Sequence, residues 1–373
     1  MHRIGFDAKR LFNNFTGLGN YSRTLVQNLL YYYPELAYFL YTPKITKNED
    51  TNVFLNSPAY SVHGPGKLEK IAWRSYQIRR QLKQHKIELF HGLSNELPAG
   101  LNKYPIKKIV TIHDVIFKHF PQQYPSTDRF VYDLKTKYAC NNADLIIAIS
   151  ESTKKDLVQF YNIKEEKIRV IYQTCSELFF QDKSEVLIDK INKKYKLPQE
   201  YMLYVGSITK RKNLLNILKA MTMLPKEMEI PLVIVGSGKA YKQEVLSFIQ
   251  SHNLGRFIFF IRPENEDLPF IYQKASLFIY PSLFEGFGIP IIEALFSETP
   301  VITSNLSSMP EAAGPDSLLI DPTAPEAIAE AIDRVLSDQQ LRANMIENGF
   351  NYAQQFRGEP LTEQLVKVYQ EIL

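Results

Sequence analysis

The sequence predicts an α/β protein built from two doubly wound parallel-sheet domains. At 373 residues the chain is long for one domain, since a domain holds about 150 residues on average. Apolar runs of strand length alternate with helical patterns from end to end, which is typical of parallel sheets covered by helices on both faces. Several of these runs lead through a glycine-containing loop into a helix, and α/β sheets bind ligands at such carboxyl ends of strands.

The composition indicates a cytoplasmic protein. Hydrophobic residues make up 45% of the chain, which is enough for sizeable cores. The first ten residues contain no long apolar segment, and no stretch reaches the roughly 18 apolar residues of a membrane span. Cys140 and Cys175 are the only cysteines, too few for a disulfide framework and not spaced as metal ligands.

Charge is unevenly distributed along the chain. Residues 1–182 carry a net charge of +8 and residues 183–373 a net charge of −4, which together give the +4 of the whole chain. A basic first half favours an anionic surface or substrate. No motif indicates nucleic-acid binding, so we expect no nucleic-acid partner.

The chain begins with a strand pattern over residues 2–7, followed by a loop that contains Gly17 and Gly19. These glycines leave room for a ligand to approach the backbone just before a helix, although a plain tight turn needs the same residues. Residues 67–86 then combine seven Lys or Arg with several aromatic and aliphatic side chains. Such a basic helix suits an anionic membrane surface, or equally a solvated helix with one face in the core.

Two further strand patterns end at histidines. Residues 87–92 lead to His91, and residues 107–113 lead to His113. Both side chains are therefore expected at the carboxyl edge of a sheet, where ligands bind, although a single such histidine is more often structural. Another strand at 144–150 precedes a helix that Ser150 or Ser152 is able to cap.

We expect the strand at 167–173 to close the first sheet and the charged stretch 176–198 to link the domains. The second domain begins with the strand YMLYVGS, after which Lys210, Arg211 and Lys212 precede a helix. Cationic side chains at a helix start suit a diphosphate, although a solvated basic turn has the same sequence. The later glycines at 236 and 238 lack the third glycine of a dinucleotide fingerprint.

Residues 277–305 read as strand, loop, helix and strand. The loop holds Gly286 and Gly288, and Pro290 sits where the first helical turn tolerates a missing N–H. The helix is apolar almost all round, with Glu293 as its one charge, and Glu285 stands at the mouth of the loop. A buried carboxylate needs a partner, so the pattern fits a ligand site or a structural ion pair of Glu293 beside a solvated Glu285.

The segment EGFGIPIIE (285–293) resembles the E-x7-E signature of the family 4 retaining glycosyltransferases, and the resemblance extends over nearly the whole chain. That family has the GT-B fold, in which two Rossmann-like doubly wound parallel-sheet domains face each other across a cleft. Its first Glu approaches the donor sugar and its second holds the nucleotide ribose. The resemblance implies catalytic residues (Glu285, His113), a ribose-binding residue (Glu293), diphosphate-binding residues (Arg211, Lys212, Gly17, Gly19, Gly288), base-binding residues (Arg262, Glu264) and donor-sugar-binding residues (Gly286, Phe287, Ile289).

The chain departs from this family after the last strand of the first domain. Family members continue there with an N-G-V-D turn, whereas this chain has Gln173-Thr174-Cys175-Ser176, which leaves an acceptor contact from that turn unsupported. We expect an acceptor-binding domain at 1–178, a donor-binding domain at 179–358, and a last helix at 359–373 that crosses back to the first domain.

The expected activity is transfer of a mannose- or glucose-type sugar from a GDP- or UDP-linked donor to a glycan or lipid-linked acceptor, with retention, in cell-surface polysaccharide synthesis. We expect neither a cofactor nor a divalent metal, because the chain has no Asp-x-Asp cluster and the Arg211 and Lys212 pair supplies positive charge. Peripheral contact with the inner face of an anionic membrane is a further expectation. The alternatives are a sugar-nucleotide epimerase on the same fold and a catalytically silent nucleotide-binding protein.

Overall fold

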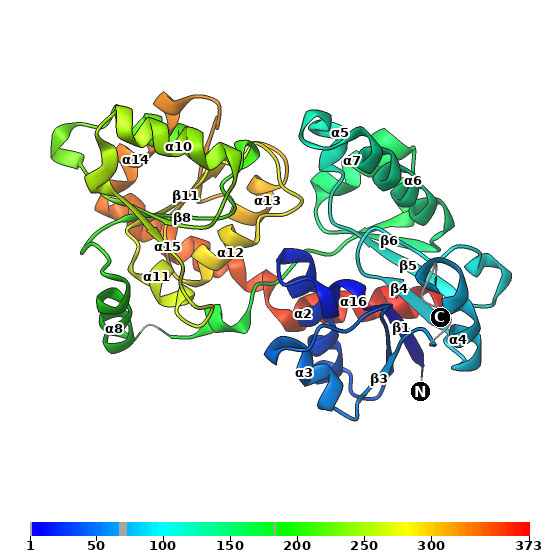
Figure 1. Cartoon of the computed structure of the whole chain (residues 1–373). Coiled ribbons are helices and arrows are strands. Elements are labelled where there is room, and N and C mark those ends of the chain that lie inside the picture. The colour runs from blue at the N-terminus through cyan, green and yellow to red at the C-terminus, as the bar shows by residue number, and fades with distance from the viewer. Residues whose placement is uncertain (1, 67–72, 183) are drawn as a thin grey trace. The chain divides into compact units, whose positions relative to one another are not determined.

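The computed structural model describes residues 2–66, 73–182 and 184–373 and divides into two compact units (Figure 1). Unit 1 comprises Met1–Thr174 and Arg357–Leu373, and unit 2 comprises Cys175–Phe356. Each unit is a parallel sheet covered by helices on both faces. The predicted fold class of two doubly wound α/β domains is confirmed.

The sheet of unit 1 has seven strands in the order β3-β2-β1-β4-β5-β6-β7, all of them parallel. Its central strands are buried on both faces, which explains their continuous apolar sequences. The order reverses between β1 and β4, where neighbouring crossovers run to opposite sides of the sheet. The strands are β1 (Arg3–Asp7), β2 (Ala37–Tyr41), β3 (Tyr60–His63), β4 (Leu89–Gly92), β5 (Lys107–Ile112), β6 (Leu145–Ala148) and β7 (Ile168–Val170).

The helices of unit 1 include the last helix of the chain, α16, which packs on α2. Leu361, Leu365 and Tyr369 recur at helical spacing on α16 and join the core of unit 1. Ser150 caps α7, since its hydroxyl accepts the backbone N–H of Thr153 at 3.0 Å. The helices are α1 (Lys9–Asn13), α2 (Gly17–Tyr32), α3 (Glu49–Asn56), α4 (Ile78–Gln84), α5 (Ile116–His119), α6 (Ser126–Asn142), α7 (Glu151–Tyr161) and α16 (Gly358–Ile372).

Unit 2 repeats this plan with a parallel six-stranded sheet in the order β10-β9-β8-β11-β12-β13. Here the order reverses between β8 and β11. Met202 and Tyr204 point into one large apolar core with Ile234 and Ile279. The strands are β8 (Met202–Val205), β9 (Leu232–Val235), β10 (Ile258–Ile261), β11 (Leu277–Tyr280), β12 (Val301–Ser304) and β13 (Leu318–Ile320).

Helices cover both faces of the unit 2 sheet, with α10 and α14 on one face and α11 and α12 on the other (Figure 1). Helix α9 packs on α10 and α14, and α8 packs on α11. The apolar helix expected after Gly288 is α12, and five of its eight residues are buried, in line with its sequence. The helices are α8 (Glu185–Tyr195), α9 (Leu214–Met221), α10 (Ala240–Ser251), α11 (Leu268–Lys274), α12 (Ile289–Phe296), α13 (Met309–Ala313), α14 (Pro325–Ser337) and α15 (Gln339–Ala353).

The prediction of a linker over residues 176–198 is wrong. This stretch contains helix α8, which packs on α11 inside unit 2, while the chain leaves unit 1 at Thr174. Its high charge suggested a solvated segment, but Ile188 and Ile191 form a buried stripe on a helix that is mostly exposed. A stripe of two residues is enough to dock a short helix.

The basic stretch 67–86 is only partly described, since residues 67–72 lie outside the described residues. From Trp73 onward it forms one π-helical turn and then α4. Trp73, Ile78 and Leu82 are buried in a core cluster of unit 1. Arg74 forms ion pairs with Asp7 and Glu96, so its charge is neutralised inside the unit.

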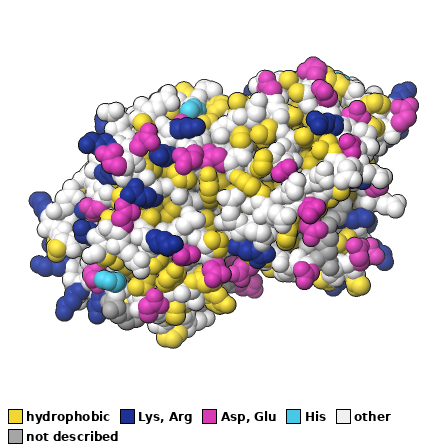
Figure 2. All heavy atoms as spheres, turned by 180° about the vertical axis from the view of Figure 1, so that it is seen from behind, with side chains coloured by type: hydrophobic (Ala, Val, Ile, Leu, Met, Phe, Trp, Pro, Cys, Tyr) yellow, Lys and Arg dark blue, Asp and Glu magenta, His cyan; other side chains and the backbone are white. Residues whose placement is uncertain are grey.

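None of the helices among the described residues combines the length and apolar character that a membrane crossing requires. On the face seen in Figure 2, basic and acidic side chains are interspersed among apolar ones.

Candidate functional site

The candidate site lies at the carboxyl edge of the unit 2 sheet, at its point of reversal. The loop after β8 (206–213) and the loop after β11 (281–288) meet there, because β8 and β11 are neighbouring strands. In open α/β sheets the crevice at this reversal is where ligands bind. The fold therefore brings together the two loops that the sequence singled out.

The two loops are tied together by Asn213. This residue adopts a left-handed backbone conformation with φ of 60° at the start of α9. Its side-chain amide donates to the carbonyls of Pro281 at 3.1 Å and Pro322 at 2.6 Å. The preceding 3-10 turn, Lys210–Lys212, is thereby held against the loop that carries Glu285.

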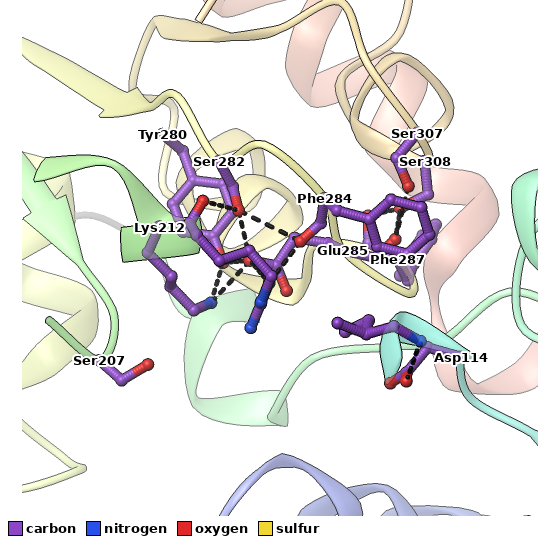
Figure 3. A network of polar contacts seen from close by, with 12 residues as sticks. Asp114, Ser207, Lys212, Tyr280, Ser282, Phe284, Glu285, Phe287, Ser307 and Ser308 are labelled. Carbon is purple, nitrogen blue, oxygen red and sulfur yellow. Dashed lines mark hydrogen bonds and ion pairs between the residues drawn. The ribbon is translucent and has the colours of Figure 1, made fainter. Parts of the chain in front are cut away.

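Glu285 is the centre of a dense polar network (Figure 3). Its Oε1 lies 2.7 Å from Nη1 of Arg211 and 3.0 Å from Nζ of Lys212. The same oxygen accepts hydrogen bonds from the hydroxyls of Tyr280 at 3.1 Å and Ser282 at 2.7 Å. The three charged side chains are only 12–16% exposed, so they interact where water screens them little.

The network holds Glu285 as a carboxylate. Burial disfavours its charge, but the charges of Lys212 and Arg211 outweigh that effect and lower its pKa to about 2. Two cations facing one carboxylate leave a net charge of +1 within this group of three. A partly buried surplus of positive charge at the start of a helix attracts an anion, and a diphosphate fits that requirement.

Phe287 and its neighbouring glycines shape the loop through their backbone. Gly288 begins α12 with φ of +118°, a conformation that favours glycine. The hydroxyl of Ser308 donates to the carbonyls of Glu285 at 2.9 Å and Phe287 at 2.8 Å (Figure 3). The Phe287 ring is buried against Phe356, with 5.4 Å between ring centroids, so this side chain is part of the core of unit 2.

Glu293 lies on α12 and has a hydroxyl partner. The phenol of Tyr272 donates to Glu293 Oε2 at 3.0 Å, and within the described part of the chain no Lys or Arg forms an ion pair with Glu293. Burial raises its pKa to about 7, although the Tyr272 hydrogen bond and the charge of Lys212 act the other way. Among the described residues, Glu293 therefore has no structural ion pair, and the hydroxyl of Tyr272 is its hydrogen-bond donor.

The raised pKa of Glu293 predicts a pH-dependent cost to folding. The folded chain holds this proton up to about pH 7, whereas an unfolded chain releases it near its ordinary pKa of 4.5. Stability is therefore lost as pH rises from about 4.5 to about 7. We expect Glu293→Gln to stabilise the chain by about 2–3 kcal/mol at pH 8 and to be nearly neutral at pH 4. Urea unfolding of both proteins at the two pH values measures this, and an equal difference at both would contradict it.

Arg262 and Glu264, the predicted base-binding residues, follow β10 and are exposed. The Glu264 backbone N–H donates to the hydroxyl of Tyr195 at 3.1 Å, and its carboxylate lies 2.6 Å from Nζ of Lys194. These groups are therefore engaged with α8. Their role toward a base stays a prediction, as does that of half-buried Ile289 toward a sugar.

Gly17 and Gly19 lie in the first turn of α2 in unit 1, not in a loop before it. A Cβ on Gly19 would come within 1.7 Å of the carbonyl oxygen of Asn14, so this position requires glycine for packing inside the unit. Gly17 faces open space, with no described atom within 4 Å of a Cβ built on it. Their role toward phosphate stays a prediction.

His113 directly follows β5 and is buried in unit 1. Its Nε2 lies 2.9 Å from the carbonyl oxygen of Leu93, and its Nδ1 lies 3.1 Å from the side-chain nitrogen of Gln173. His91 is also buried and hydrogen-bonds to Tyr369 and Thr111. The described residues hold no group of three or more His, Cys, Asp or Glu side chains arranged for a metal ion.

The sequence reasoning missed several residues of the site. Tyr280, Ser282 and Ser308 surround Glu285 and its loop, and Tyr272 is the partner of Glu293. Tyr280 and Ser282 flank the end of β11, so their position at a strand end was the available signal. Tyr272 and Ser308 come from other elements, and only tertiary structure brings them to the site.

Two parallel-sheet α/β units with a paired cationic site at a topological switch point are the arrangement expected of a glycosyltransferase of the GT-B class. The model of Glycosyltransferase Family 4 matches residues 16–174, and that of Glycosyl transferases group 1 matches residues 188–352. The chain belongs to the family 4 glycosyltransferases.

The O-antigen chain mannosyltransferase B of Escherichia coli is 29% identical to this chain, over 98% of this chain and 99% of that protein. Among solved structures, sucrose-phosphate synthase from Thermosynechococcus elongatus superposes with a TM-score of 0.79 at 20% identity, over 100% of this chain and 99% of that one. Anabaena Alr3699/HepE in complex with UDP has a TM-score of 0.78 at 15% identity, with both chains fully covered. These two structures support the fold.

Proposed function

We propose that this chain transfers mannose from a nucleoside-diphosphate sugar to a glycan or lipid-linked acceptor in polysaccharide synthesis. The observation that carries the proposal is the cluster of Arg211, Lys212 and Glu285 at the switch point of unit 2. The name of the E. coli relative supports mannose as the sugar and a polysaccharide as the product. A glucose-type donor is the second candidate, because a structural neighbour was solved with UDP-glucose.

The proposed donor site uses the charges already paired in the network. The diphosphate would lie at Arg211 and Lys212 near the start of α12, where cations and backbone N–H groups stabilise the charge that develops as the sugar leaves. Glu293 would accept hydrogen bonds from the ribose hydroxyls, and binding would then favour its ionised form. Glu285 would turn from its ion pairs toward the donor sugar.

We propose retention without a covalent glycosyl-enzyme. A retaining hydrolase needs one carboxylate as nucleophile and a second as acid and base about 5 Å away. Here Glu293 is assigned to ribose, which leaves Glu285 as the one carboxylate of the cluster for the sugar. The acceptor would enter on the face of the leaving diphosphate, and that phosphate would take the acceptor proton.

Incubation with a panel of GDP- and UDP-sugars tests the proposal. Transfer of the sugar to an acceptor, with release of the nucleoside diphosphate, is the expected result, and GDP-mannose is the expected donor. Isomerisation of the nucleotide sugar would show the epimerase instead. Binding without turnover of any donor would show the silent nucleotide-binding protein.

Transfer should persist in EDTA. The reason is that Arg211 and Lys212 supply the positive charge that a divalent cation supplies elsewhere. Initial rates measured after dialysis against EDTA should match the untreated rate. Activity that vanishes and returns only with Mg²⁺ or Mn²⁺ would overturn this assignment.

Contact of unit 1 with an anionic membrane is a separate proposal, supported by the exposed end of the basic stretch. Arg80 is exposed, and Arg79 bonds through its Nε to the backbone of exposed Tyr76. Reversing both arginine charges should weaken binding to anionic phospholipid vesicles by roughly 1 kcal/mol or more for each arginine, since each basic side chain near the surface contributes about that much. Reversal of Lys190 and Lys193 on α8 is the matched control. If the arginine variant cosediments with the vesicles as the wild type does, α4 is a solvated helix without a membrane role.

A further inference from the structure

His113 is fixed by hydrogen bonds at each of its polar atoms. Its backbone N–H donates to Oδ1 of Asn95 at 3.0 Å, and its carbonyl accepts from the hydroxyl of Thr153 at 3.3 Å. Its ring nitrogens meet the carbonyl of Leu93 at 2.9 Å and the amide of Gln173 at 3.1 Å. A side chain held at this many points has one orientation.

The partners determine which ring nitrogen carries the proton. A backbone carbonyl only accepts, so the Nε2 that faces Leu93 must be protonated. Nδ1 of a neutral ring is then a bare acceptor, and the amide N–H of Gln173 is the donor that meets it. The two contacts thus select the same tautomer.

The surroundings of the ring keep it neutral. Burial lowers the pKa of His113 to about 4, the Leu93 carbonyl opposes this, and the positive charge of Arg10 adds to it. Among the described residues, the ring also has His91, which burial keeps neutral as well, and Tyr21 as titratable neighbours. None of these neighbours supplies the negative charge that would stabilise an imidazolium.

A chain of hydrogen bonds also holds Tyr21, whose ring packs against the ring of His113. The Tyr21 ring stands edge-on to His113, with 4.6 Å between ring centroids and 89° between the planes. The Tyr21 hydroxyl lies 3.1 Å from Oγ1 of Thr111, which lies 2.8 Å from Nε2 of His91. Nδ1 of His91 lies 2.7 Å from the hydroxyl of Tyr369 on α16. Hydrogen bonds therefore connect the last helix of the chain, α16, to the Tyr21 side chain against which His113 packs.

We propose that Gln173 is a positioning residue for the transfer reaction, holding His113 as a neutral imidazole with its proton on Nε2. A ring held in this state takes no part in proton transfer near pH 7. This inference rests on the proposed function and on the catalytic role that the family resemblance implies for His113. It also gives a role to the segment that begins at Gln173, where the sequence departs from the family turn.

Nitrogen-15 NMR of the full chain with labelled histidine tests the tautomer directly. In the wild-type protein the His113 signals should show a bare Nδ1 and a protonated Nε2, with no titration between about pH 6 and pH 8. The signals are assigned by their loss in His113→Gln. A proton on Nδ1, or titration in that range, would overturn the proposal.

The variant Gln173→Glu provides a second test of the proposal. A carboxylate accepts and never donates, so it should draw a proton onto Nδ1 and raise the pKa of His113, making the ring an imidazolium near pH 7. We expect kcat to fall roughly tenfold or more with the donor KM little changed, because the ring is misplaced and charged. Gln173→Met, which removes the donor without adding charge, should keep the Nε2 proton and lose less activity.

Gln159→Glu on the exposed face of α7 is the matched control for the added charge and should change neither spectrum nor rate. Gln173→Glu with wild-type His113 signals would contradict the positioning role. Failure of the proposed function looks different. In that case neither the wild type nor any variant transfers a sugar, while the NMR spectra still report the tautomer of His113.

Discussion

Replacing Glu285 by Gln should slow sugar transfer by a hundredfold or more, in the range expected for removing one electrostatic stabiliser of a transition state. The substitution keeps the shape of the side chain and removes the charge that meets Arg211 and Lys212. Affinity for the nucleoside diphosphate should stay the same or rise, since the carboxylate no longer competes with phosphate for the two cations. Initial rates and calorimetric titration with GDP and UDP separate the two effects.

The same substitution should also lower stability. The pKa of Glu285 is about 2 in the folded chain against an ordinary value of 4.5, so its pairing stabilises the fold above about pH 4.5 and is lost as pH falls toward 2. We expect Glu285→Gln to cost about 2–3 kcal/mol at pH 7. Glu266→Gln, at an exposed position beyond β10, is the control for both measurements. A variant that keeps the wild-type rate would show that Glu285 is a structural partner of the two cations and nothing more.

Arg211→Ala should weaken donor binding or transfer by about 2–5 kcal/mol, because a partly buried phosphate charge would lose its partner. Lys212→Ala should act in the same direction with a smaller effect. The cause lies in the charge of the site, since either change leaves one cation against the Glu285 carboxylate and removes the surplus that attracts an anion. Donor affinity and kcat/KM measured for each variant give the two effects.

Lys210→Ala is the matched control for this prediction. Lys210 belongs to the same 3-10 turn but is 67% exposed and pairs with Glu244 at 3.2 Å, away from Glu285. Its removal should change transfer little, because an exposed ion pair contributes little. If Arg211→Ala and Lys210→Ala behave alike, the phosphate site lies elsewhere.

The sequence was sufficient to predict the strand, loop and helix around Glu285. A buried parallel strand such as β11 has a continuous apolar sequence, and Gly288 and Pro290 mark the start of α12 locally. These signals depend on neighbouring residues only. For the same reason the fold class followed from alternating patterns, whereas the short strands β2 and β3 were not identified one by one.

The pairing of Glu285 with Arg211 and Lys212 was not predictable in that way. The residues belong to different loops, and only the adjacency of β8 and β11 brings them together. Local sequence predicted the residue types of a phosphate site but not that a carboxylate holds the cations in place. Gly19 is a different case, since its sequence context predicted a loop before a helix, whereas it lies inside α2 and packs against the backbone of Asn14.

Proton NMR of the first product formed from GDP-mannose and a panel of alkyl hexoside acceptors tests the central claim most directly. Retaining transfer from the donor site of unit 2 predicts a new α-linked mannoside that appears together with free GDP. It also predicts that this product forms at least about a hundredfold more slowly with Glu285→Gln. A β-linked product, an isomerised nucleotide sugar, or a mannosylated Glu285 peptide found by mass spectrometry would contradict the mechanism.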